Sequence, residues 1–463
     1  MLNDNSQKQT ITPFVSALSI ALLLAGCGGG GSSSSINIKP SSYVLDNDDY
    51  NPSSAGLTIT RNDSTPPVAP LSRSSVASST AGVYQQQTIT NATAMWHEGY
   101  LGQNMTIGFV DSGVNPDHVD FYDDDANSRV LWQQARGMIE TDRSGYEIEI
   151  NNDYIDIDED IGSGGYHGTH ITSIAAGREF GLAPEASILP VNVFFDNASA
   201  YNTVIHTAVD YIAQNAPIIN ASITEMVNFS SIGGQNSELN AYYTTLKNHN
   251  SVLVTAAGNG GEDELGDPIG AEHFENFNRA RNLSIIDGIE NQVLHVIALE
   301  DSPTSQGSNE YEITNFSNYP GSCSDVSPNT DLACNDEVMS AIQNNFIAAP
   351  GLIIEAAYGN NDSTSINYSG TSMATPVISG GLALLLSAWD QLTPQEAVAI
   401  LKASANRSGI YSDASLYGVG LLDLEAALQP LGELKSSASI NNTKEQSQNS
   451  SATSPAAYSL NDS

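Results

Sequence analysis

Residues 367–389 read NYSGTSMATPVISGGLALLLSAW, and the chain is organised around Ser372 within this stretch. The apolar segment Met373–Trp389 is long enough for about four helical turns. Ser372 would therefore stand at a helix N-terminus, where free N–H groups and the positive end of the helix dipole favour developing negative charge. Pro376 is predicted to lie in the first turn, where its missing N–H costs little.

The string GTSMATP, residues 370–376, is more specific than a helix cap. Gly370 and Thr371 are small and would leave room for a substrate backbone, although a Gly-Thr-Ser run before a helix can also serve only as an N-cap. The full string resembles the nucleophile motif of the subtilases, the S8 family of subtilisin-like serine peptidases. That resemblance implies an aspartate and a histidine upstream, in a fixed order.

Two upstream segments supply these residues. A predicted strand over residues 106–110 ends at Asp111, and ligands gather at the carboxyl ends of strands in open parallel sheets. Asp-Ser-Gly is also a common turn sequence, which leaves a turn aspartate as the alternative. Tyr-His-Gly-Thr-His, residues 166–170, opens an Ala-rich helix and resembles the family's histidine motif. The resemblance implies that His167 is the base, and His170 is interpreted as a packing residue.

Further family segments surround the predicted cleft. SVLVTAAGNGG, residues 251–261, resembles the segment that carries the oxyanion-hole asparagine, here Asn259, although a turn asparagine is the alternative. In PIINASI, residues 217–223, Asn220 and Ser222 match an Asn-x-Ser-x-Gly strand end, but Thr224 replaces the glycine and leaves specificity in doubt. The predicted cleft residues are Ser222, Ile223, Thr224, Ala257 and Gly258.

The resemblance covers roughly residues 95–430 and implies a three-layer α/β subtilisin-like fold, with a mostly parallel twisted sheet flanked by helices. Alternating strands and helices from 103 to 300 agree with it. It implies a serine endopeptidase that forms an acyl-enzyme through Asp111, His167 and Ser372, with Asn259 binding the oxyanion. A silent peptide-binding pseudoprotease and a triad-dependent peptide ligase remain as alternatives. These motifs do not identify the natural substrate.

Charge restricts the partners. The chain has 463 residues, with 53 Asp and Glu against 15 Lys and Arg, a formal net charge of −38. Such a surface repels nucleic acid and anionic lipid headgroups, so we expect neither as a partner. We expect a monomer that acts on proteins or peptides.

The first 90 residues predict export and tethering. Residues 11–25 form an apolar run of signal-peptide length, and Leu24–Cys27 resembles a bacterial lipobox, which implies lipidation of Cys27 after removal of residues 1–26. Gly28 in the next position implies the outer membrane of a Gram-negative bacterium, facing the periplasm or the cell surface. An ordinary secretory signal is the alternative. Residues 27–90 are Gly-, Ser- and Pro-rich and predict a flexible tether.

The catalytic domain is predicted over residues 91–430, followed by a disordered Ser- and Asn-rich tail, 431–463. Leu421-Leu422-Asp423 and the cysteine loop before Ala-Pro-Gly resemble autotransporter subtilases, but with 33 residues after Pro430 we expect no β-barrel to follow. Outside the cytoplasm, Cys323 and Cys334 are predicted to pair.

An acidic insert precedes the histidine motif. Nine Asp or Glu residues lie between Glu140 and Asp160. Asp156, Asp158 and Asp160 alternate with other residues and could turn towards one calcium ion. A solvated acidic loop is the favoured interpretation. We expect no required cofactor.

Overall fold

The structure of the chain is a computed structural model. It describes residues 84–140, 148–150, 166–194, 202–223, 244–260, 291–301, 310–323 and 336–429. The predictions for the signal peptide, Cys27, the calcium candidates Asp156, Asp158 and Asp160, Thr224, Cys334 and the tail lie outside these residues.

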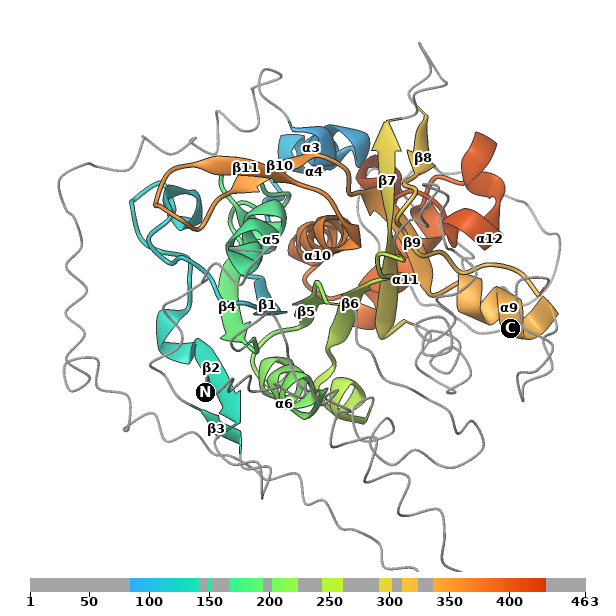
Figure 1. Cartoon of the computed structure of the whole chain (residues 1–463). Helices are drawn as coiled ribbons and strands as arrows, with labels where there is room; N and C mark the ends of the chain where they lie inside the picture. The colour runs from blue at the N-terminus through green and yellow to red at the C-terminus, as the bar shows by residue number, and fades with distance from the viewer. Residues whose placement is uncertain are drawn as a thin grey trace, which may run out of the picture. The chain divides into compact units, whose positions relative to one another are not determined.

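A nine-stranded sheet forms the centre of the described residues (Figure 1). Its strands run in the order β3-β2-β4-β1-β5-β6-β7-β8, and β9 also pairs with β7. Every pairing is parallel except those of β3 with β2 and β8 with β7. The strands are β1 (Thr106–Asp111), β2 (Arg136–Glu140), β3 (Ile148–Ile150), β4 (Ser187–Asn192), β5 (Ile218–Ala221), β6 (Val252–Ala256), β7 (Val293–Asp301), β8 (Tyr311–Ile313) and β9 (Phe346–Pro350).

Helices cover both faces of this sheet. Helices α5 (His167–Ala176) and α10 (Thr371–Ala388) lie on one face, and α6 (Asn202–Ala213) lies on the other (Figure 1). Both faces of a strand therefore need apolar side chains. In β1, Ile107 belongs to the core beneath α5 and α10, whereas Val110 belongs to the core beneath α6. The predicted three-layer α/β fold is confirmed.

Helix α10 is the central helix of the domain. It is apolar and long enough to cross a membrane, but 83% of it is buried inside the protein. It packs closely on α5, because a Cβ on Gly380 would lie 2.8 Å from the Ala175 carbonyl oxygen. The helix begins at Thr371, earlier than predicted, so Pro376 lies in the second turn and not in the first.

The predicted boundary of the tether is wrong, because residues 84–90 belong to the folded domain. Helix α3 (Gln85–Ile89) lies against the domain, and its Gln86 and Gln87 are buried. The Gln87 side-chain nitrogen donates to the carbonyls of Glu179 and Gly181, at 2.9 and 3.0 Å. Hydrogen bonds from buried amides hold this segment, together with the Tyr84 ring against Phe180 and Ile89 against the core. The stretch is too short and too polar to show an apolar period, which is why the prediction places it in the tether.

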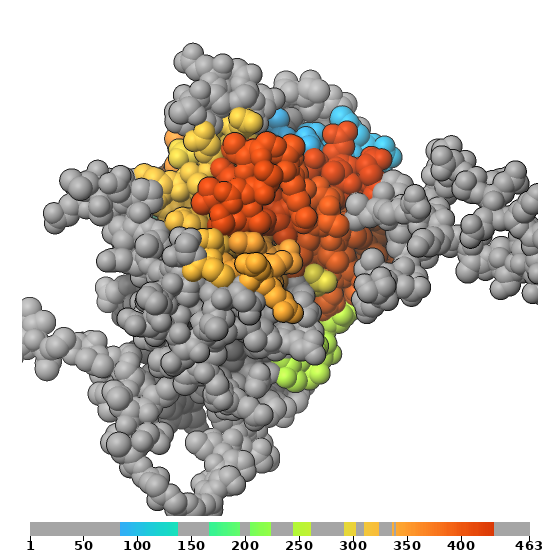
Figure 2. Space-filling model, turned by 90° about the vertical axis from the view of Figure 1, so that its right-hand side faces the viewer, coloured from blue at the N-terminus to red at the C-terminus, as the bar shows by residue number. Residues whose placement is uncertain are grey.

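The two ends of the described domain meet. The Leu424 N–H donates to the Thr90 carbonyl at 2.9 Å, and the Asn91 side chain donates to Asp423 at 3.0 Å. Figure 2 shows the blue N-terminal helices beside the red C-terminal segments on one face. The remaining elements are α4 (Ala92–His97), α9 (Asp336–Gln343), β10 (Ile354–Ala357), β11 (Ser365–Tyr368), α11 (Pro394–Ser404), α12 (Ala414–Tyr417) and α13 (Leu424–Ala427).

Candidate active site

Three neighbouring parallel strands deliver polar residues to one edge of the sheet. Asp111 is the last residue of β1, Ser222 follows β5, and Asn259 follows β6. Strands β1, β5 and β6 are adjacent and parallel, so their carboxyl ends lie together. This is the edge at which open parallel sheets place ligands.

The carboxylate of Asp111 binds the imidazole of His167. The distance from His167 Nδ1 to Asp111 Oδ1 is 2.7 Å, and the carboxylate residue is 1% exposed. Ser112 also donates to the same oxygen, from its backbone N–H at 2.8 Å and from its hydroxyl at 3.3 Å. These donors offset part of the cost of removing the charge from water, all at Oδ1, because Oδ2 has no hydrogen-bond partner among the described residues.

The start of α5 is packed tightly against this carboxylate loop. The Gly168 N–H donates to the Ser112 hydroxyl oxygen at 2.8 Å, and a Cβ on Gly168 would lie 2.1 Å from the Gly113 carbonyl oxygen. Only glycine fits at residue 168, because a side chain would push the helix away. The close approach fixes His167, the first residue of α5, relative to Asp111.

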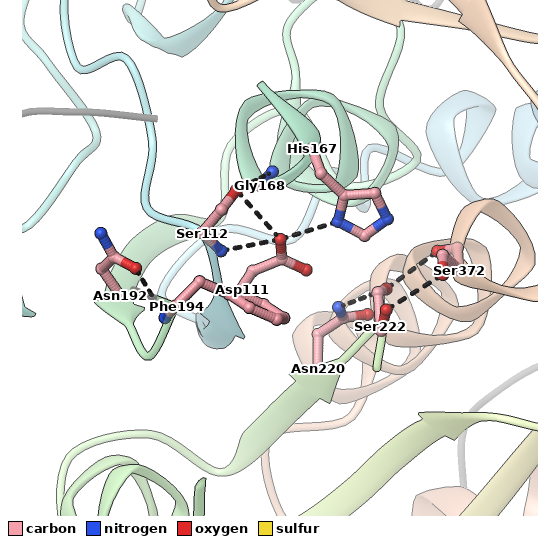
Figure 3. Close-up of polar contacts among 9 residues, drawn as sticks. All are labelled: Asp111, Ser112, His167, Gly168, Asn192, Phe194, Asn220, Ser222 and Ser372. Atoms are coloured by element: carbon pink, nitrogen blue, oxygen red, sulfur yellow. Dashed lines mark hydrogen bonds and ion pairs between the residues drawn. The ribbon is translucent and has the colours of Figure 1, made fainter. Parts of the chain in front are cut away.

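Ser372 lies across the site from Asp111. Figure 3 shows the His167 imidazole between the Asp111 carboxylate and the start of α10, which carries Ser372. The Ser372 hydroxyl donates to the Ser222 carbonyl at 3.0 Å. A hydroxyl has a single hydrogen, so in this rotamer Ser372 does not donate it to His167.

The Asn259 amide is oriented by Thr371. Its Oδ1 accepts from the Thr371 N–H and from the Thr371 hydroxyl, both at 2.9 Å. The Nδ2 group is thereby turned towards Gly370, where a Cβ would lie 3.4 Å from Asn259 Nδ2 and 3.6 Å from Ser372 N. The Ser372 N–H is one of the first four of its helix, which have no helical acceptor. Two donors thus converge beside Gly370.

The small size of Thr371 predicts that it leaves room for a substrate backbone. The structure contradicts this prediction. Thr371 is fully buried, and its hydroxyl also accepts from the Gly258 N–H at 3.2 Å. Its role was missed because its partners lie 112 and 113 residues away in the sequence. The polar hydroxyl in an otherwise small-residue turn was the available signal.

His170 is the second histidine of the motif, and it is fully buried. Its Nε2 lies 3.1 Å from the carbonyl oxygens of Ile354 in β10 and Ile366 in β11, so it joins both strands of the hairpin to α5. Burial lowers the pKa of His170 to about 3. The residue is therefore a neutral packing group, as predicted.

The other predicted cleft residues adjoin the same edge. Ala257 and Gly258 are buried, and Asn318 supports them through hydrogen bonds to both of their carbonyls, at 3.0 and 2.9 Å. Ile223 is half-buried, and its carbonyl accepts from the Thr255 hydroxyl at 3.2 Å.

Two further predictions concern metals and cysteines. Within the described residues, no group of three or more His, Cys, Asp or Glu side chains could hold a metal ion. Cys323 is disulfide-bonded. Its pairing with Cys334 stays a prediction, because Cys334 lies outside the described residues.

Most of the described domain is similar in sequence to known proteins. A family model described as the Subtilase family matches residues 102–420. Subtilisin DY of Bacillus licheniformis is 24% identical over 339 residues, which cover 72% of this chain and 93% of that protein. The subtilisin-like protease 2 of Arthroderma otae is 23% identical over 328 residues, which cover 66% of this chain but 60% of the relative.

Among solved structures, the prenylagaramide maturation protease PagA matches with 25% sequence identity and a TM-score of 0.47. The match covers 73% of this chain and 97% of that one.

Proposed function

The chain belongs to the subtilase family, and from this premise we propose that it is a serine endopeptidase whose triad is Asp111, His167 and Ser372. The single observation that carries the proposal is the 2.7 Å contact between His167 Nδ1 and the buried Asp111 carboxylate, on the side of the imidazole away from Ser372. An N–H at Nδ1 leaves Nε2 with a lone pair, which a general base requires.

Catalysis then starts with a change of hydrogen bond. The Ser372 hydroxyl leaves the Ser222 carbonyl and turns towards His167 Nε2, since catalytic hydrogen bonds often tighten only when substrate is bound. Ser372 Oγ attacks the peptide carbonyl carbon while its proton moves to Nε2. Asp111 holds the imidazole in the required tautomer and stabilises its positive charge.

The tetrahedral intermediate places its oxyanion beside Gly370. Asn259 Nδ2 and the Ser372 N–H would donate to it, and both donors lie at this glycine before any substrate arrives. Collapse of the intermediate breaks the C–N bond, and the leaving amine takes the proton from Nε2. The acyl-enzyme ester that remains is hydrolysed by water through the same steps in reverse order.

A fluorophosphonate probe tests this proposal. We expect the wild-type protein to be labelled covalently and the Ser372→Ala variant to show no labelling, while both unfold at similar temperatures. A folded wild-type protein that neither labels nor cleaves an unfolded protein substrate would instead support a silent peptide-binding protein. Equal labelling of the variant would place the nucleophile elsewhere.

We also propose that the protein is attached to the outer membrane by a lipid on Cys27, which rests on the lipobox resemblance of Leu24–Cys27. Protein or peptide substrates would then be met at the periplasmic face or at the cell surface. Replacing Cys27 by serine should move the protein from the membrane fraction to the soluble fraction. Unchanged partitioning would contradict the lipid anchor.

A further inference from the structure

Ser222 and Ser372 are joined by two hydrogen bonds that run in opposite directions (Figure 3). The Ser222 hydroxyl donates to the Ser372 carbonyl at 2.8 Å, and the Ser372 hydroxyl donates to the Ser222 carbonyl at 3.0 Å. The two residues are 150 positions apart, and Ser222 is 2% exposed. One residue at the end of β5 therefore binds both the side chain and the main chain of the predicted nucleophile.

Pro376 explains why the Ser372 carbonyl needs this partner. In an α-helix the carbonyl of residue 372 accepts from the N–H of residue 376, but proline has none, and its ring crowds that carbonyl. A buried carbonyl left without a donor is costly. The Ser222 hydroxyl supplies the donor that helix α10 lacks at this position.

The hydrogen of the Ser222 hydroxyl has a fixed direction. Asn220 Nδ2 donates to Ser222 Oγ at 3.0 Å, and Asn220 Oδ1 accepts from the Ser379 hydroxyl at 2.9 Å. Asn220 and Ser379 are fully buried. Because the Asn220 amide occupies an acceptor site of Ser222 Oγ, the hydroxyl hydrogen is left to point at the Ser372 carbonyl. The chain of bonds starts and ends on α10.

We propose that Ser222 is a positioning residue for the nucleophile: its hydroxyl replaces the helical hydrogen bond that Pro376 removes, and so sets the place of the Ser372 peptide unit at the sheet edge. This inference rests on the proposed peptidase function. Without the hydroxyl, the Ser372 carbonyl loses its donor and the Ser372 peptide unit is held less closely relative to His167, although Thr371 keeps its own bonds to Asn259. Attack by Ser372 Oγ then slows even where substrate binds equally well.

A double-mutant cycle with Pro376 tests the proposal. Labelling by a fluorophosphonate is measured as a saturable reaction in the wild type, Ser222→Ala, Pro376→Ala and the double variant. Ser222→Ala should lower the limiting rate about tenfold with little change in the half-saturating concentration. In the Pro376→Ala background an alanine N–H can bond to the Ser372 carbonyl, so the same substitution should cost less than about threefold.

Ser251→Ala is the matched control. Ser251 is equally buried, and its hydroxyl also donates to main-chain carbonyls, but it precedes β6 at the opposite edge of the sheet. It should lower the unfolding temperature and leave the limiting rate unchanged. Equal losses from Ser222→Ala in both backgrounds would overturn the proposal, and so would a Ser222→Ala variant that labels at the wild-type rate.

Thermal unfolding of the four proteins separates this inference from the peptidase itself, because it needs no activity. The loss of unfolding temperature caused by Ser222→Ala should shrink when Pro376 is also replaced. If the losses of unfolding temperature from Ser222→Ala and Pro376→Ala simply add, the Ser222 hydroxyl does not replace the helical hydrogen bond that Pro376 removes. That outcome would refute the proposal even in an active enzyme. A wild-type protein that shows the exchange but never labels would refute the peptidase, and with it the positioning role.

Discussion

His167 Nδ1 lies 2.7 Å from Asp111 Oδ1, and Asp111 is almost completely buried while the imidazole keeps a side-chain exposure of 20%. We predict that Asp111→Asn lowers the rate of fluorophosphonate labelling about 10³- to 10⁴-fold. An amide that donates to Nδ1 would leave the hydrogen on Nε2, where it cannot accept the Ser372 proton. Labelling time courses measure this loss.

Asp125→Asn provides the control for Asp111→Asn. Asp125 is exposed in the loop after η1 (Val119–Phe121), so removing its charge should leave labelling unchanged. The unfolding temperature should show that both variants are folded. Labelling of Asp111→Asn within tenfold of the wild type would contradict the assigned tautomer.

Asn259 is exposed, and its amide oxygen is already occupied by Thr371. We predict that Asn259→Ala lowers turnover of a peptide substrate about 10²- to 10³-fold, because one oxyanion donor is lost. The free energy of unfolding should fall by about 1–3 kcal/mol, because the N–H and hydroxyl of the buried Thr371 lose their acceptor. Steady-state kinetics and thermal unfolding check the two parts.

The exposed Asn361 in the β10–β11 connection offers a matched substitution, since its side chain also accepts from main-chain N–H. Asn361→Ala should keep full turnover. Similar turnover for Asn259→Ala and the wild type would remove Asn259 from the oxyanion hole.

Local sequence predicted the parts of the site that depend on local structure. The strand before Asp111 ends where expected, and the predicted Ala-rich helix begins at His167 and ends at Ala176, directly before Gly177. Helix α11 begins with a capping box between Thr393 and Glu396, a pattern that the residue types and their spacing indicate by themselves. In each case neighbouring residues decide the conformation, so a short pattern carries the information.

Long-range hydrogen bonds could not be predicted in this way. The bonds from Thr371 to Asn259 and between Ser222 and Ser372 join residues more than 100 positions apart. Serine, threonine and asparagine also occur in turns and caps, so their identity alone does not indicate a buried partner. The start of α10 before Pro376 was misplaced because glycine and threonine are weak helix formers.

Residues 84–90 are predicted as part of the tether because glutamine is a polar residue that does not indicate burial. Since Gln87 is buried in the structure, its replacement should affect stability. Gln87→Ala should lower the free energy of unfolding by about 1–3 kcal/mol, because the buried Gly181 carbonyl and the partly buried Glu179 carbonyl lose their donor. The neighbouring Thr88 is exposed, and Thr88→Ala should cost far less. Chemical denaturation compares the two variants. Equal stabilities of the two variants would mean that residues 84–90 do not stabilise the folded domain and belong to the tether.

His170 makes stability depend on pH. Its Nε2 faces two carbonyl oxygens and therefore carries the hydrogen, while the buried Nδ1 has no hydrogen-bond partner among the described residues. A proton on Nδ1 would place an unsatisfied positive charge in the core. Burial accordingly lowers the pKa of His170 to about 3 in the folded protein, against about 6.5 when unfolded.

Between these two pKa values the unfolded chain binds a proton that the folded protein excludes, so acid favours unfolding. As the pH falls from about 6.5 towards 3, His170 should remove about 1.4 kcal/mol of stability for each pH unit. His170→Gln keeps N–H donors for the carbonyls of Ile354 and Ile366 but cannot titrate. The free energies of unfolding of the wild type and His170→Gln are measured in urea at pH 6.5, 5.5 and 4.5. The wild type should lose more stability than the variant as the pH falls, so that the difference between the two shrinks or changes sign. Parallel curves would mean that His170 binds its proton as readily in the folded protein as in the unfolded chain, and they would contradict its burial as a neutral group between α5 and the hairpin.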